Sequence, residues 1–160
     1  MEHLDCRELF KNKESYDNKD VVIEGWIRTN RGSNKFGFLE INDGTFFKHV
    51  QVVYEADKIS NFEEVSKMSI SAALTIQGRF VLTPEAKQPF EIKAASIKLQ
   101  ADSHSDYPLQ KKRHSPEYLR EIAHLRPRSN TFAAVFRIRS VIAYAVHQLE
   151  IGRASCRERV

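Results

Sequence analysis

Cysteine and long apolar runs are scarce in this sequence. It has 2 cysteines among 160 residues, Cys6 and Cys156, and neither has a cysteine or histidine partner at a spacing that zinc sites use. We therefore expect no disulfide framework and no metal site. The chain has no run of about 18 or more apolar residues and no charged segment leading into an apolar one at its start. These absences predict a cytoplasmic protein that makes no membrane contact.

Motifs for catalysis are also missing. The sequence shows no nucleophile beside a base and no glycine-rich phosphate loop. Three carboxylates lie on or beside expected strands, Glu24, Glu40 and Asp43, but their spacing does not pair them as acid and base. We interpret them as solvated surface groups. No catalytic residue is predicted, and this chain alone is expected to bind rather than to catalyse.

The charge of the chain is a weak guide to its partner. The net charge is +4 and the pI is about 9.1, which is compatible with a polyanionic ligand. However, Arg153, Arg157 and Arg159 lie within the last ten residues and supply much of the excess. A function in nucleic-acid binding therefore has to be argued from local patterns.

The first 100 residues predict an all-β domain. β-favouring residues alternate along five segments, and isoleucine, phenylalanine and valine recur at helical spacing in a sixth. The expected strands are residues 21–27, 35–41, 49–54, 71–82 and 90–99, and the expected helix is 57–67. Three strands, a helix and two strands is the order of an OB-fold, a five-stranded Greek-key barrel. Residues 1–100 are therefore predicted to form an OB-fold domain.

A linker, a helix and a tail are expected to follow. Residues 101–130 are polar and rich in basic groups, which either form a solvated face or contact a nucleic-acid backbone or neighbouring domain. Residues 131–149 place apolar side chains on one stripe of a helix, namely Val135, Ile138, Ile142, Ala145 and Leu149. Residues 150–160 break this pattern at Gly152 and read like a translated sequencing adapter. We expect them to be a non-native tail and the natural protein to continue past Gln148.

The expected second strand carries the strongest functional signal. With a period of two, Leu39 and Ile41 share one face, and Phe36, Phe38 and Glu40 share the other. The acidic neighbour indicates that the phenylalanine face points outward. Exposed rings of this kind suit stacking on unpaired bases, although a curled barrel could also bury both of them.

Two polar side chains are expected beside these rings. Gln51 has the opposite parity from Val50 and Val52, so its amide points outward if the valines fill the barrel. Arg31, at the corner between the first two strands, offers a planar fork to a base or a phosphate. Together with the rings, these residues predict recognition of single-stranded RNA or DNA.

Two blocks of the sequence resemble the N-terminal part of a known enzyme family. The first block consists of Gly25-Trp26-Ile27-Arg28, Phe38-Leu39-Glu40-Ile41-Asn42-Asp43-Gly44 and Val50-Gln51-Val52. It is similar to the anticodon-binding OB domain of class IIb aminoacyl-tRNA synthetases. The second block, at residues 107–114 and 119–128, resembles the connection into the catalytic domain of the asparaginyl branch. The resemblance is therefore to asparaginyl-tRNA synthetase, over about residues 5–148.

The resemblance implies roles for four residues, and a fifth is added from its position. Phe38 would stack on the central uridine of the anticodon, Gln51 would hydrogen-bond the edge of that base, and Arg31 would contact the base or its backbone. Arg28 is a weaker candidate for contact with a phosphate. Phe36 has no firm counterpart in the family, because the loop after Gly32 differs in length between branches, so its place in the nucleic-acid-binding set rests on its position beside Phe38.

The resemblance also implies an activity for the full-length family. Such enzymes use ATP and Mg²⁺ to form asparaginyl-adenylate, charge tRNA-Asn and work as homodimers. Helix 131–149 resembles the first helix of their class II catalytic domain, and the three class II motifs would lie beyond Gln148. This fragment is therefore expected to bind the anticodon loop of tRNA-Asn without cofactor and without catalysis. The alternatives are a free-standing OB module for single-stranded nucleic acid and a protein-interaction OB module.

Overall fold

The computed structural model describes residues 3–157, and for residues 150–157 it describes the backbone alone. The chain forms two compact units, the first ending at Lys111 and the second beginning at Lys112. Within the described residues, no helix combines the length and the apolar content needed to cross a lipid bilayer.

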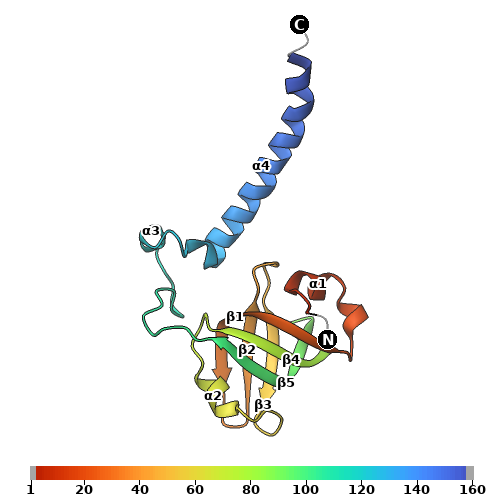
Figure 1. The fold of residues 1–160 in the computed structure, drawn as a ribbon, viewed down its shortest axis with the longest axis vertical. Coiled ribbons are helices and arrows are strands. Elements are labelled where there is room, and N and C mark those ends of the chain that lie inside the picture. The colour runs from red at the N-terminus through yellow and green to blue at the C-terminus, as the bar shows by residue number, and fades with distance from the viewer. Residues whose placement is uncertain (1–2, 158–160) are drawn as a thin grey trace. The chain divides into compact units, whose positions relative to one another are not determined.

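The first unit is built around a closed barrel with the strand order β1-β2-β3-β5-β4 (Figure 1). Its strands are β1 (Asp20–Gly32), β2 (Phe36–Asn42), β3 (Val50–Glu55), β4 (Ala73–Leu82) and β5 (Phe90–Ala101). Neighbouring strands are antiparallel except β3 and β5, which are parallel. A short helix, α2 (Phe62–Lys67), lies between β3 and β4. The predicted OB-fold barrel is confirmed.

Two elements of the barrel differ in length from the prediction. The helix α2 begins at Phe62 rather than near Asp57, because residues 57–61 form turns that bury Ile59 in the core. The strand β1 extends to Gly32, well past Ile27. Its register with β2 shifts between Ile27 and Thr29, and this irregularity lets one bent strand pair with both β2 and β4.

The barrel core follows the alternation of the strands. Leu39 and Ile41 from β2 and Val50 and Val52 from β3 are buried, as their parity predicts. Three aromatic rings are the largest fully buried side chains, namely Tyr54, Phe80 and Phe90. Since the inward positions are filled by apolar groups, polar side chains of β1, β2 and β3 are directed to the outer face.

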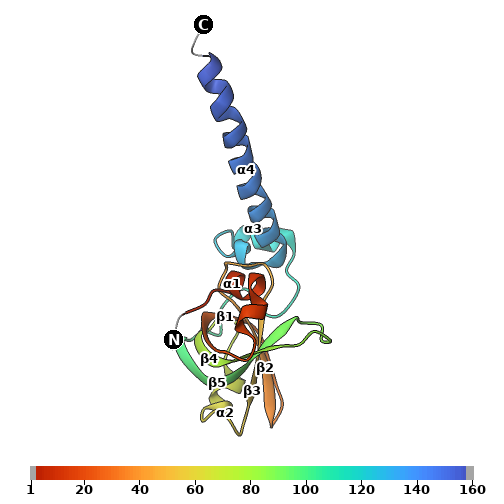
Figure 2. The same cartoon turned by 90° about the vertical axis from the view of Figure 1, so that its right-hand side faces the viewer.

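A helix near the N-terminus closes one end of the barrel. Asp5 begins α1 (Cys6–Lys11) by accepting a hydrogen bond from the Glu8 amide, and a 3-10 turn (Lys13–Tyr16) follows. Leu9 from α1 lies in the core, and the Phe10 ring is 4.8 Å from that of Phe46 in the β2–β3 loop. Figure 2 shows α1 beside the end of the barrel. The helix therefore anchors the loop that joins β2 to β3.

The second unit is helical. It contains α3 (Pro116–Glu121), a 3-10 turn (Arg126–Arg128) and α4 (Asn130–Arg157). The first two elements lie within the expected linker. The Arg126 guanidinium lies 5.2 Å from the Phe132 ring centroid and 5.4 Å from that of Phe136, which joins the turn to α4.

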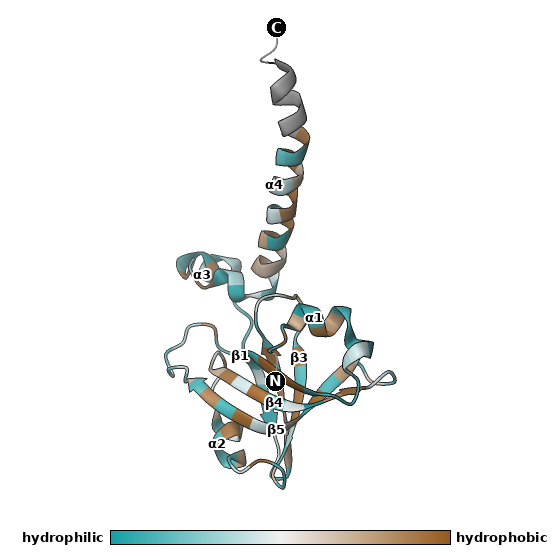
Figure 3. Cartoon of the chain, turned by 45° about the vertical axis from the view of Figure 1, so that its right-hand side comes forward, coloured by the Kyte–Doolittle hydropathy of each residue, from teal (hydrophilic) through white to brown (hydrophobic). Residues whose placement is uncertain are grey.

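The helix α4 is longer than predicted. It passes through Gly152 to Arg157 instead of ending at Leu149, because one glycine inside a helix costs only about 1 kcal/mol. The expected stripe lies on the surface, with Val135, Ile138, Ile142 and Leu149 all exposed, and Figure 3 shows hydrophobic patches along this helix. Of the expected tail, residues 158–160 lie outside the described residues.

Candidate nucleic-acid interface

The two phenylalanines of β2 lie on the outer face of the barrel. Phe36 is 47% exposed and Phe38 is half-buried, whereas Leu39 and Ile41 on the opposite parity are buried. The two rings meet edge to face, with centroids 5.6 Å apart and an interplanar angle of 84°. The predicted outward orientation is confirmed, and burial of both rings is excluded. A contact of this geometry fixes the orientation of the Phe38 ring.

Arg31 lies beside Phe38. The two residues are directly paired across β1 and β2, and Val53 of β3 pairs with Phe38 on its other side. The Arg31 side chain is 63% exposed, and its Nη2 atom lies 3.2 Å from Glu40 Oε1. Its guanidinium is therefore both accessible to a ligand and restrained by a carboxylate.

Gln51 completes the predicted group. It pairs with Glu40 across β2 and β3, and Val50 and Val52 on either side of it are buried. Its amide therefore belongs to the same outer face as Phe38 and Arg31. Gln51 is the diagonal neighbour of Phe38, and such positions are about 7–8 Å apart, so a base stacked on the Phe38 ring lies between Arg31 on β1 and Gln51 on β3. The placement of these three residues agrees with the prediction.

Arg28 lies apart from Phe38. It occupies the irregularity of β1 between Ile27 and Thr29, where the register with β2 shifts. Its positive charge acts on His49, which precedes β3. Arg28 therefore belongs to the His49 end of the outer face.

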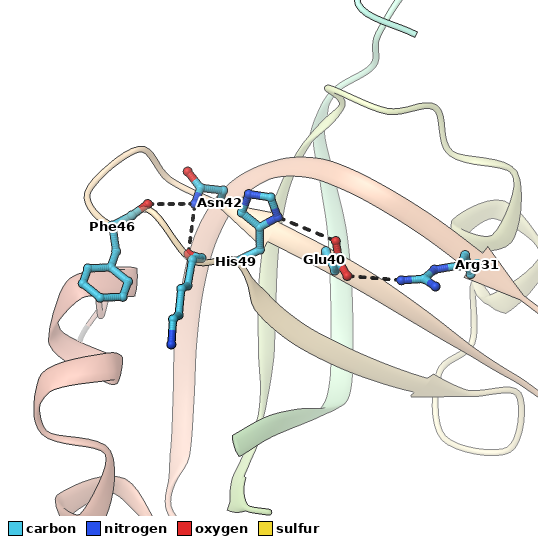
Figure 4. Close-up of polar contacts among 6 residues, drawn as sticks. Arg31, Glu40, Asn42, Phe46 and His49 are labelled. Carbon is cyan, nitrogen blue, oxygen red and sulfur yellow. Dashed lines mark hydrogen bonds and ion pairs between the residues drawn. The ribbon is translucent and has the colours of Figure 1, made fainter. Parts of the chain in front are cut away.

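Sequence reasoning missed the part that Glu40 and His49 play. The Glu40 side chain is 21% exposed, and its Oε2 atom lies 3.6 Å from His49 Nδ1 while Oε1 pairs with Arg31 (Figure 4). Its interpretation as a solvated surface group is wrong, because both oxygens have cationic or ionisable partners. No periodic pattern in the sequence signals this contact. It follows from the strand register, in which Glu40 pairs with Gln51 and is therefore diagonal to His49.

The imidazole of His49 is electrostatically perturbed. Burial lowers the pKa of His49 below its ordinary value, the positive charge of Arg28 lowers it further, and Glu40 acts in the opposite direction. Near neutral pH the ring is therefore mainly uncharged. The cluster of Arg28, Arg31, Glu40 and His49 then carries a net positive charge that increases when the imidazole takes up a proton.

The β2–β3 loop holds this end of the face in place. Asn42 Nδ2 donates hydrogen bonds to the carbonyl oxygens of Phe46, at 3.0 Å, and Lys48, at 3.2 Å (Figure 4). Its Oδ1 accepts a hydrogen bond from the Gly44 amide. Gly44 has a φ of +86°, a left-handed conformation that favours glycine. The loop that leads into His49 is therefore ordered by its own side chains.

Asp43 ties the same loop to α1. Its carboxylate accepts hydrogen bonds from the Cys6 amide at 2.7 Å and from the amide and hydroxyl of Thr45, each at 2.8 Å. Burial acts to raise the pKa of Asp43, but the hydrogen bonds outweigh it and hold the pKa below its ordinary value. Asp43 is therefore a structural residue, and its interpretation as a solvated group is also wrong.

The described residues contain no group of three or more His, Cys, Asp or Glu side chains that could hold a metal ion. What the outer face offers is an aromatic ring, a guanidinium and an amide on three adjacent strands. This combination suits stacking on an unpaired base and hydrogen bonding to its edge.

Known proteins share both the sequence and the fold. The chain is 60% identical to an asparagine–tRNA ligase of Alkaliphilus oremlandii and 59% identical to that of Clostridium acetobutylicum. Each alignment spans 148 residues, which is 92% of this chain. The resemblance to asparaginyl-tRNA synthetases is confirmed. The chain spans only 32% of the length of these relatives, corresponding to their N-terminal third.

The structural comparison agrees. The crystal structure of asparaginyl-tRNA synthetase from Pyrococcus horikoshii complexed with asparaginyl-adenylate matches 95% of this chain and 35% of its own, with a TM-score of 0.81 at 24% identity. At that identity the match supports the fold alone. Residues 21–100, which contain all five strands except the first residue of β1 and the last of β5, match the family described as the OB-fold nucleic acid binding domain, and the chain belongs to this family.

Proposed function

We propose that this chain recognises the anticodon loop of tRNA-Asn through the outer face of β1, β2 and β3. The observation that carries the proposal is that Phe38 is directly paired with Arg31 on β1 and is the diagonal neighbour of Gln51 on β3. Stacking on one ring and hydrogen bonding to one base edge is how proteins read unpaired RNA bases. The similarity to asparagine–tRNA ligases supports tRNA-Asn as the RNA.

Each residue has a distinct part in this proposal. Phe38 stacks on the central anticodon base, Gln51 hydrogen-bonds the edge of that base, and Arg31 contacts the base or its backbone. Phe36 supports the Phe38 ring through their edge-to-face contact. Arg28 contacts a phosphate toward the His49 end of the face.

The activity of the whole protein is part of the proposal. The relatives are named as asparagine–tRNA ligases, and the full-length protein would use ATP and Mg²⁺ to charge tRNA-Asn, acting as a homodimer in the cytoplasm. That activity is assigned to the part of the relatives that this chain does not span. The chain itself contributes recognition of the tRNA.

A binding titration tests this function. The chain is mixed with a labelled anticodon stem-loop of tRNA-Asn and, separately, with the same stem-loop in which the central anticodon base is replaced. We expect saturable binding to the first and about five- to 150-fold weaker binding to the second, because each mismatched contact costs about 1–3 kcal/mol. Equal affinity for both RNAs would support the alternative, a module for single-stranded nucleic acid. Absence of binding to either would reject both.

A further inference from the structure

A carboxylate lies in the middle of the proposed RNA-binding face. Glu40 is flanked by Thr29 on β1 and by Gln51 on β3, and it follows Phe38 on the same face of β2. RNA is a polyanion, so a negative charge in this place opposes binding unless it has a purpose. The role of Glu40 is not explained by stacking or by base-edge contacts alone.

The carboxylate of Glu40 is much more buried than the guanidinium of Arg31. The Glu40 side chain is 21% exposed, against 63% for Arg31, and each of its oxygens has a partner. Arg31 on β1 and His49, which directly precedes β3, are diagonal neighbours of Glu40. The exposed side chain of Arg31 is therefore restrained by the shorter and more buried side chain of Glu40. This restraint keeps the guanidinium beside Phe38, where it can contact a base stacked on the ring.

Arg31 and His49 are the positive and ionisable partners of Glu40. The charge of His49 itself depends on Glu40 from β2 and on Arg28 from β1, and Lys48 is its exposed neighbour in the loop. Protonation of His49 adds one positive charge next to Glu40. The cluster then attracts RNA more strongly and partly relieves the repulsion from the carboxylate.

From this geometry we propose that Glu40 is a positioning and specificity residue. It holds Arg31 for contact with a base and repels misplaced phosphates. When the pH falls, protonated His49 offsets the negative charge of Glu40. The proposal rests on the proposed function, because it concerns the same face. It goes further by assigning discrimination between RNAs to a carboxylate. It also makes RNA affinity dependent on one histidine.

The test compares four single variants of the whole chain with the wild type. Glu40→Gln removes the charge and keeps the shape, and His49→Gln removes the titrating group. Glu24→Gln and His104→Gln are the matched controls: Glu24 is bonded to Thr75 on β4, and His104 is an exposed partner of Asp106 beyond β5. Affinity is measured for the tRNA-Asn stem-loop and for the loop with an altered anticodon, from about pH 5.5 to about pH 8.

We expect discrimination between the two RNAs to fall about three- to fivefold in Glu40→Gln, with a gain in affinity for the altered loop. In the wild type, affinity for the stem-loop rises as the pH is lowered through the pKa of His49. This rise is lost in His49→Gln. In Glu40→Gln it moves to lower pH, because the carboxylate no longer favours the protonated imidazole. A purely structural role for Glu40 would not move this midpoint.

The outcomes separate this proposal from the proposed function. Wild-type protein that fails to distinguish the two RNAs rejects the function itself. Wild-type protein that distinguishes them, together with a Glu40→Gln variant that matches Glu24→Gln in both discrimination and pH midpoint, rejects only the role of Glu40. If Glu40→Gln does not fold, Arg31→Gln gives the second test. It should lose the same discrimination while keeping the wild-type pH dependence, and unchanged discrimination overturns the proposal.

Discussion

The ring of Tyr54 fills the space directly above the Cα atom of Gly37. The two residues are paired across β2 and β3, and a Cβ atom on Gly37 would overlap the Tyr54 ring. The Tyr54 hydroxyl donates a hydrogen bond to Asn30 Oδ1 at 3.0 Å, and Asn30 Nδ2 donates to the Val65 carbonyl of α2 at 2.8 Å. The glycine between the two outward phenylalanines therefore allows a buried tyrosine to join the barrel to α2.

Gly37→Ala is accordingly expected to destabilise the chain. The added methyl group must push aside either the Tyr54 ring or strand β2, and overpacking of this kind costs about 1–3 kcal/mol. Urea unfolding followed by circular dichroism measures the change. The double variant with Tyr54→Leu supplies the control, since a smaller side chain should remove much of the added penalty. If Gly37→Ala lowered the free energy of unfolding equally in the wild type and in Tyr54→Leu, the added methyl group would not clash with the Tyr54 ring.

Phe38→Ala should weaken binding of the tRNA-Asn stem-loop by about 1–3 kcal/mol, the contribution of one stacked base. The ring is half-buried on the outer face, so its removal leaves the barrel core intact. Fluorescence anisotropy with labelled RNA measures the affinity, and the thermal midpoint checks the fold.

Phe36→Ala is the matched comparison, because Phe36 contacts the Phe38 ring edge-on and lies at the margin of the group. Its effect should be smaller than that of Phe38→Ala. A folded Phe38→Ala variant with wild-type affinity would remove Phe38 from the site. A larger loss in Phe36→Ala would make Phe36 the principal stacking residue.

The sequence was sufficient to predict the barrel and the outward side chains. Alternation with a period of two determines which side chains of β2 and β3 are buried, so Phe38 and Gln51 could be placed before the structure was known. The pairing of Arg31 with Phe38 required the register of β1, which depends on the irregularity after Ile27. Local propensity does not specify such a shift in register.

The carboxylates show the opposite case. Glu40 and Asp43 look alike in sequence, as acidic residues near the end of a strand, and the sequence alone predicts that both are solvated. Their partners come from β1, from the β2–β3 loop and from α1, which approach only when the barrel closes. Hydrogen bonds between groups distant in the chain leave no periodic pattern. The function of these side chains therefore had to be found in three dimensions.

Asp43→Asn is expected to lower the free energy of unfolding by about 1–3 kcal/mol near neutral pH, because the carboxylate satisfies the Cys6 amide and two donors of Thr45. The pKa of Asp43 is held below its ordinary value by these hydrogen bonds, against the effect of burial. Its stabilisation is thus present above an unfolded-state pKa of 3.8 and is lost as the pH falls through the lower folded-state value.

Urea unfolding at about pH 7 and about pH 3 tests both parts of this prediction. The difference in stability between wild type and variant should shrink at the lower pH. Asp57→Asn is the control, since Asp57 is exposed in the turn after β3. A difference that stays constant with pH would mean that the ionised carboxylate does not account for the stabilisation.

The exposed apolar residues of α4 predict self-association of this chain. Ile138 and Ile142 are 60% and 57% exposed and lie one turn apart on the helix. Burial of apolar surface is favourable by roughly 25 cal/mol per Å², so pairing of two such helices competes with their exposure to water.

Sedimentation velocity over a range of concentrations should show growing average mass for the wild type. Ile138→Lys combined with Ile142→Lys should abolish this growth, whereas Ser140→Lys, which adds a charge at an exposed polar position of the same helix, should preserve it. A wild type that stays monomeric at every concentration would show that the exposed face of α4 is too small or too mobile to hold a second copy.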